Sequence, residues 1–186
     1  NLLGALNLTR RSGIKIKGEK MKALITGASG GIGSAVAELL RQNGYEILTL
    51  SSRFEDLDAL AKECRSLAAA QGIDALILCA GTTKFSPLEA MSESEILKIL
   101  NVNLAANIII ARAFLPNLKR NRAHIIGISS IEALRASRFS AVYSYLLYFI
   151  NHFTTAVVTL AWITFSIFVS QYRTCCFHYL VAHKIL

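Results

Sequence analysis

Acidic residues, glycine and proline are missing from the end of this 186-residue chain. None of the 12 Asp and Glu residues lies beyond Glu132, no glycine lies beyond Gly127, and the whole chain has only two prolines. A segment without turn-forming residues is not expected to supply further connections between strands and helices. We therefore expect residues 146–186 to be an apolar, atypical tail rather than a continuation of the preceding domain.

Charge is unevenly distributed along the chain. The net charge is +8, of which residues 1–20 carry +4 and residues 144–186 carry +2. The central residues 21–143 thus carry only +2, which is ordinary for a soluble surface and argues against a nucleic-acid partner. The apolar content of 53% excludes a disordered chain, and the length suits one domain with its own core.

Cysteine is scarce, and its spacing does not fit a metal site. Cys64 and Cys79 lie in apolar segments, where a buried and reduced thiol is the expected state, and Cys175 and Cys176 are adjacent. We therefore expect no bound metal and a cytoplasmic location.

The first 20 residues contain no long apolar run after the paired arginines Arg10 and Arg11. This composition does not predict a secretory or twin-arginine signal. Met21 opens the organised part of the chain, and we expect it to be the native start. Residues 1–20 are then an extension, disordered or not native, and residues 21–145 form the folded domain.

From Met21 onward, short apolar runs alternate with longer amphipathic segments, which is typical of a parallel sheet covered by helices. In the first helix, 32–44, we expect Ile32, Val36, Leu39 and Leu40 to share the buried face and Gly44 to be a left-handed cap. The predicted strands are 22–26, 46–51, 73–79 and 123–130, and the other predicted helices are 56–70 and 92–116.

The last of these helices has clear end signals. Ser92 and Glu95 have the spacing of a capping box at its start, and Pro116 is expected to limit its far end.

A glycine-rich segment, TGASGGIG from Thr26 to Gly33, separates the first strand from the first helix. Gly27 permits a tight turn, Gly31 leaves room for a pyrophosphate, and Gly33 lets the helix pack against the strand. The positive N-terminal end of the helix attracts the same anion. In this context the segment predicts a dinucleotide-binding turn.

The segment resembles the Thr-Gly-x-x-x-Gly-x-Gly fingerprint of the short-chain dehydrogenase/reductase family, and further family motifs follow in order. LCAG (78–81) is similar to the family's Asn-Asn-Ala-Gly, NVNL contains Asn103, ISS contains Ser130, and Tyr143 follows Ser130 at the family's spacing. The resemblance covers residues 21–145. It implies an α/β, Rossmann-like, doubly wound parallel sheet with helices on both faces, whose C-terminal strands are incomplete here.

The resemblance also implies a cofactor site and its residues. At the end of the second strand, Ser52 and Arg53 offer hydrogen-bond donors and positive charge, so we expect NADP rather than NAD, although Arg53 could simply be an exposed arginine. Asp56 corresponds to the family's adenine-side aspartate. The implied cofactor-binding residues are Gly27, Ser29, Gly31, Ile32, Gly33, Ser52, Arg53, Asp56, Ala80 and Gly81.

The implied catalytic residues are Asn103, Ser130 and Tyr143, for hydride transfer between the nicotinamide and a carbonyl or alcohol substrate. In the family, a lysine four residues after the tyrosine lowers the phenol's pKa, but here that position is Leu147. A unit charge about 4 Å from the phenolate contributes roughly 4 kcal/mol at an effective dielectric constant of ~20, which is about three decades in rate. We therefore expect an NADP(H)-dependent oxidoreductase of this type whose activity is impaired.

Two alternatives remain open. The chain could be a non-catalytic dinucleotide-binding protein, or residues 146–170 could anchor it in a membrane, which we do not favour; residues 139–172 contain no charged side chain. A frameshift or truncation near residue 144 would also explain the tail. The resemblance further implies a homo-oligomer formed through the long helices, and it leaves the small-molecule substrate unidentified.

Overall fold

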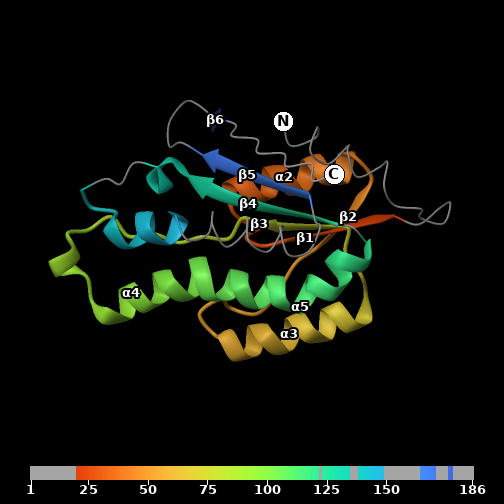
Figure 1. The fold of residues 1–186 in the computed structure, drawn as a ribbon, viewed down its shortest axis with the longest axis horizontal. Coiled ribbons are helices and arrows are strands. Elements are labelled where there is room, and N and C mark those ends of the chain that lie inside the picture. The colour runs from red at the N-terminus through yellow and green to blue at the C-terminus, as the bar shows by residue number, and fades with distance from the viewer. Residues whose placement is uncertain (1–19, 122, 135–137, 149–163, 171–175, 178–186) are drawn as a thin grey trace.

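The protein is organised around one twisted sheet. The computed structural model describes residues 20–121, 123–134, 138–148, 164–170 and 176–177. The sheet contains β1 (Met21–Ile25), β2 (Tyr45–Leu48), β3 (Ala75–Leu78), β4 (His124–Ser130), β5 (Thr164–Ser170) and β6 (Cys176–Phe177). Their order across the sheet is β2-β1-β3-β4-β5-β6, and every neighbouring pair is parallel except β5 and β6 (Figure 1). This confirms the predicted fold class.

Helices cover both faces of the sheet because the strand residues alternate between them. Leu24 and Leu76 pack with α3 (Leu57–Ala70) and α5 (Ala106–Asn121) on one face, where Phe114 is fully buried. Ile25 and Ile77 pack with α2 (Gly31–Gln42) on the other. Figure 1 shows α3 and α5 together on one side of the strands and α2 on the opposite side. The sheet is therefore doubly wound.

The buried face of α2 differs from the one predicted. Its buried residues are Gly33, Val36, Ala37 and Leu40, whereas the side chain of Ile32 is 48% exposed. The set 33, 36, 37 and 40 has the helical spacing, and it brings two small residues against the sheet where the backbones come close. Gly44 has a φ of +84°, so its predicted left-handed conformation is confirmed.

The long helix extends further than predicted. The capping box of Ser92 and Glu95 is confirmed at the start of α4 (Glu93–Leu100), which continues through a π-helical turn, Asn101–Ala105, into α5. Pro116 was expected to limit this helix but lies inside α5, which ends at Asn121. A proline deprives the carbonyl four residues earlier of its partner. Here both Pro116 and Arg112 are exposed, so water can reach that carbonyl.

The tail contributes two strands, β5 and β6, that its composition did not predict. β5 pairs with β4 over seven residues, from His124 and Thr164 to Ser130 and Ser170. Residues 164–170 are therefore part of the sheet and not of a helix across a membrane. Of the proposed anchor, residues 149–163 lie outside the described residues, as do residues 1–19 of the predicted extension.

One helix in the described part of the chain, Glu93–Asn121, is long and apolar enough to span a bilayer. It combines α4 and α5, and α5 packs against the sheet, so it is a core helix of the fold. Such helices meet the same length and composition criteria, and this finding does not favour a membrane location.

Candidate active site

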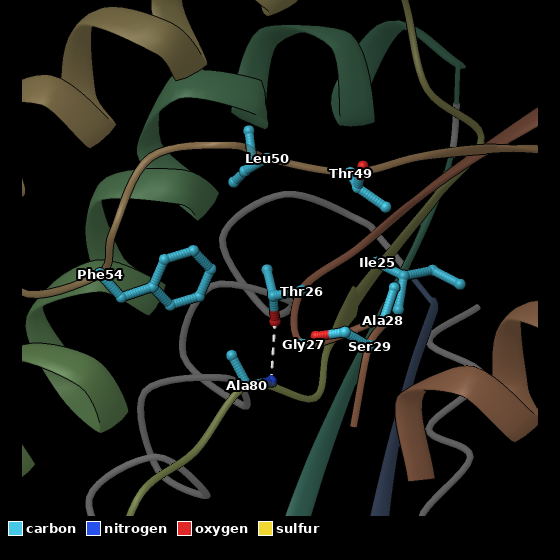
Figure 2. Close-up of a pocket in the computed structure, with 9 residues that line it drawn as sticks. All are labelled: Ile25, Thr26, Gly27, Ala28, Ser29, Thr49, Leu50, Phe54 and Ala80. Carbon is cyan, nitrogen blue, oxygen red and sulfur yellow. Dashed lines mark hydrogen bonds between the residues drawn. The ribbon is translucent and has the colours of Figure 1, made fainter. Parts of the chain in front are cut away.

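The turn between β1 and α2 is fixed by two close backbone approaches. Gly27 has a φ of +67°, and a Cβ there would lie 2.8 Å from the Cα of Ala80. A Cβ on Gly33 would lie only 2.1 Å from the carbonyl oxygen of Gly27. The hydroxyl of Thr26 accepts hydrogen bonds from the backbone N–H groups of Cys79 and Ala80, each at 2.9 Å. Figure 2 shows the bond to Ala80. The turn is thus bound to the carboxyl end of β3.

A cavity of about 390 Å³ opens above this turn. Figure 2 shows the glycine turn on one side of it and the segment after β2 on the other. The lining residues are Ile25, Thr26, Gly27, Ala28, Ser29, Thr49, Leu50, Phe54 and Ala80. Of the predicted cofactor residues, Gly27, Ser29 and Ala80 line the cavity. Gly31, Ile32 and Gly33 are in the first turn of α2, and Gly81 follows Ala80.

The N-terminal end of α2 has no side-chain cap. Its N-cap residue is Gly30, no side chain of the described residues caps its first N–H groups, and that turn contains no acidic residue. By contrast, α3 is capped by Asp56, and α4 has its capping box. The first N–H groups of a helix attract anions. The end of α2 can therefore accept an anion from outside the chain.

The segment after β2 is held by a residue that the sequence analysis did not identify. The carboxylate of Glu63, in α3, accepts hydrogen bonds from the N–H of Ser51 at 2.7 Å, the hydroxyl of Ser51 at 2.8 Å and the N–H of Ser52 at 2.8 Å. Burial raises the pKa of Glu63, but these hydrogen bonds outweigh it and lower the pKa to about 2. The carboxylate is therefore ionised at neutral pH.

The other predicted residues of this segment have different environments. Arg53 is exposed beside Ser52. The side chain of Asp56 accepts a hydrogen bond from the N–H of Ala59 at 3.0 Å, which makes it the N-cap of α3. This cap gives Asp56 a role in folding that is independent of any adenine contact.

Asn103 lies in the π-helical turn and is 2% exposed. Its side-chain oxygen accepts a hydrogen bond from the N–H of Thr82 at 3.0 Å, and its NH₂ group donates to the carbonyls of Thr82 at 2.7 Å and Ile99 at 2.9 Å. The NH₂ group of Asn107 donates in turn to the carbonyl of Asn103 at 2.7 Å. Asn103 therefore fastens the chain just after Gly81 to the long helix.

Ser130 and Tyr143 belong to neighbouring elements. Ser130 ends β4, and its hydroxyl accepts a hydrogen bond from the N–H of Glu132 at 3.3 Å. Tyr143 is in the helix 141–148. The carboxylate of Glu132 accepts hydrogen bonds from the hydroxyls of Ser140 and Ser144, which ties the turn after Ser130 to that helix.

Leu147 is buried, with 3% of its side chain exposed. It packs with Ala133, and Tyr143 and Leu104 are partly buried against the pair. The position where the resemblance implies a lysine is therefore part of an apolar cluster beside the tyrosine.

The sequence is similar to those of known proteins. Residues 21–71 and 67–161 match the short chain dehydrogenase family. A 3-oxoacyl-[acyl-carrier-protein] reductase of Rickettsia conorii is 34% identical over 140 residues, covering 65% of this chain and 58% of that protein. Nodulation protein G of a Rhizobium species is 32% identical over 133 residues, covering 59% and 54%.

Solved structures agree. A metagenomic short-chain oxidoreductase in complex with NADP has a TM-score of 0.75 and 25% identity, covering 84% of this chain and 85% of that one. An alcohol dehydrogenase from Thermococcus sibiricus has a TM-score of 0.74 and 22% identity, covering 80% and 75%.

The chain therefore belongs to the short-chain dehydrogenase/reductase family. It spans somewhat less than two thirds of the length of the curated relatives it matches.

Replacing Gly33 by alanine should disrupt the turn. The added methyl group would overlap the carbonyl of Gly27, so α2 must move away from β1. We expect Gly33→Ala to lower the melting temperature by several degrees, whereas Gly30→Ala, whose Cβ would have its nearest contact at 3.4 Å, should change it little. Thermal unfolding followed by circular dichroism measures both, and equal effects would contradict the close approach.

Glu63 should contribute to stability only when it is ionised. Its pKa is lowered from 4.5 to about 2 in the folded protein, so its contribution is present above about pH 5 and is lost as the pH falls through 2. The free energy of unfolding of Glu63→Gln should therefore lie below that of the parent at pH 6, with the difference narrowing towards pH 3. Urea denaturation at both pH values measures this. A difference that stays constant would show that ionisation of Glu63 is not responsible.

Proposed function

We propose that the chain binds NADP(H) across the cavity and acts, or derives from a protein that acts, on a small carbonyl or alcohol substrate. The observation that carries this proposal is the uncapped end of α2 beside the cavity. α3 and α4 have their own capping side chains, Asp56 and Ser92, whereas the first N–H groups of α2 have no side-chain cap and can bind an external anion. A dinucleotide's pyrophosphate has the charge and size for this position.

The preference for NADP rests on Arg53. This exposed guanidinium follows β2, where the ribose of the adenosine half would lie, and it suits a 2′-phosphate. Two similar structures, the metagenomic oxidoreductase and a gluconate 5-dehydrogenase from Beutenbergia cavernae, are described as containing NADP. These complexes support a nicotinamide dinucleotide as the cofactor.

The proposed chemistry assigns one role to each catalytic residue. The nicotinamide ring, when bound, supplies or accepts the hydride. The phenol of Tyr143 gives the substrate oxygen its proton in reduction and takes it back in oxidation, while the hydroxyl of Ser130 orients that oxygen. Asn103 holds the segment after Gly81, and so fixes one wall of the site.

Leu147 limits this chemistry. A phenol with a pKa near ~10 is a poor acid and base at neutral pH unless a cation lowers that value. Leu147, Ala133 and Leu104 form an apolar cluster against which Tyr143 packs, and Leu147 itself carries no charge. We therefore propose that cofactor binding is retained and turnover is slow. The same observation favours the second candidate function, a dinucleotide-binding protein without catalysis.

The setting follows from the family. Relatives of this kind suggest a cytoplasmic protein that forms homo-oligomers through its long helices. The chain spans only part of its relatives, so the proposed substrate is defined no more narrowly than a small carbonyl or alcohol compound.

Restoring a cation should raise turnover. In Leu147→Lys, the ammonium group would approach the phenol of Tyr143 from the next helical turn, and an increase of up to about a thousandfold follows from roughly 4 kcal/mol. NADPH oxidation in the presence of a panel of small ketones and aldehydes measures it. Leu147→Met is the control, since it keeps an apolar side chain of similar volume and should give no gain. A parent that already matches Leu147→Lys would contradict the role assigned to the missing cation.

The pyrophosphate position can be tested without turnover. A Cβ on Gly31 would meet no atom within 4 Å, so Gly31→Ala should fold normally. Its methyl group would nevertheless project beside the end of α2, and we expect NADPH to bind about tenfold more weakly. Fluorescence titration of NADPH measures this, with Gln42→Ala, an exposed change at the far end of the same helix, as the control. Unchanged affinity in Gly31→Ala would exclude the end of α2 as the phosphate site.

A further inference from the structure

The hydrogen bonds of Glu63 have the chemistry of an anion site. Two consecutive backbone N–H groups and one hydroxyl, all within 2.8 Å, converge on its carboxylate. Successive N–H groups of this kind form concave nests that bind phosphate and other anions. Here the nest of Ser51 and Ser52 already contains an anion, and that anion belongs to the chain itself.

The nest lies beside the cofactor cavity. Thr49 and Leu50 immediately precede it and Phe54 follows it, and all three line the cavity (Figure 2). Neither Ser51 nor Ser52 is among the lining residues, because their donors point to α3 and not into the cavity. A group bound at the end of β2 would therefore lie close to the carboxylate of Glu63 without being able to use these donors.

We propose that Glu63 determines how strongly the site discriminates between NADP(H) and NAD(H), by occupying as a resident anion the donors that a 2′-phosphate would otherwise use. This inference rests on the proposed binding of a nicotinamide dinucleotide in the cavity. Glu63 lowers the affinity for the phosphorylated cofactor, whereas Arg53 raises it. The two charges have opposite effects on one group of the ligand.

The two cofactors should feel this carboxylate differently. The 2′-phosphate carries close to two negative charges at neutral pH; Glu63 repels it and already occupies the N–H groups of Ser51 and Ser52. The 2′-hydroxyl of NAD(H) is neutral, so neither effect acts on it strongly. The acidic residues Glu55 and Asp56 lie in the same segment, but Glu55 is paired with Lys98 at 3.2 Å and Asp56 caps α3. Glu63 is therefore the acid bound directly to the nest.

A neutral isostere tests the proposal. Glu63→Gln keeps one side-chain oxygen as an acceptor but removes the charge, and frees at least one N–H of the nest. We expect NADPH to bind about tenfold more tightly to this variant and NADH to change by less than about twofold, both measured by fluorescence titration. Glu38→Gln is the matched control: it removes one exposed acid from α2, on the other face of the sheet, and should change neither affinity.

A second variant separates charge from shape. Glu63→Asp keeps the charge on a shorter side chain, so NADPH should not bind more tightly to it than to the parent. Adenosine 2′,5′-bisphosphate and 5′-AMP, titrated by calorimetry, should repeat the contrast with the adenosine half alone. Equal changes for both cofactors in Glu63→Gln, no change, or tighter NADPH binding to Glu63→Asp would overturn the role of Glu63. If the parent and both variants bind neither dinucleotide, the proposed function fails as well.

Discussion

The contact between the backbones of Gly33 and Gly27 is the constraint on which the rest of this site depends. Because Gly33 has no Cβ, α2 can lie against the carboxyl end of β1, and its first turn lies beside the cavity. The hydroxyl of Thr26 then connects the same turn to β3 through the N–H groups of Cys79 and Ala80. Three elements, β1, α2 and β3, are thus joined within a few residues of the cavity, and in the described part of the chain the first N–H groups of α2 have no side-chain cap.

On the opposite side of the cavity, the backbone N–H donors already bind an anion that belongs to the chain. There the donors are Ser51 and Ser52, and the anion is the carboxylate of Glu63. Leu50 and Phe54 pack the segment from Thr49 to Phe54 against the core, and Glu63 holds the backbone between them. An internal anion stabilises such a segment without a ligand, but it also leaves a charge where a charged ligand would approach. If Glu63 acts as proposed, stability of the unliganded protein and affinity for a 2′-phosphate are opposed, because both depend on the same donors.

The sequence predicted the features that depend on neighbouring residues, but not those that depend on tertiary contacts. The capping box of Ser92 and Glu95 and the left-handed Gly44 depend on residues within a few positions, so the sequence was enough. Glu63 could not be found this way, because it lies 11 and 12 residues from its partners and only the packing of α3 brings it to them.

The errors have the same origin. Pro116 ends a helix only where its lost hydrogen bond cannot be replaced, and Ile32 is buried only if the helix faces the sheet at that position. Both depend on tertiary exposure, which the local pattern does not contain. The pairing of β5 with β4 is also a property of the sheet rather than of the tail's composition.

In the function proposed above, binding and catalysis depend on different ends of the site. The cofactor's phosphates would use the glycine turn and the end of α2, which are formed by residues 26–33 and supported by β3. Proton transfer would use Tyr143, which is in a helix more than 100 residues later in the chain. Burial of Leu147 against Ala133 stabilises that helix through apolar contact, and a lysine there would have to give up this burial to keep its charge solvated. The residue that removes the cation also anchors the tyrosine, so a chain of this kind can lose turnover while the framework that binds the dinucleotide remains intact.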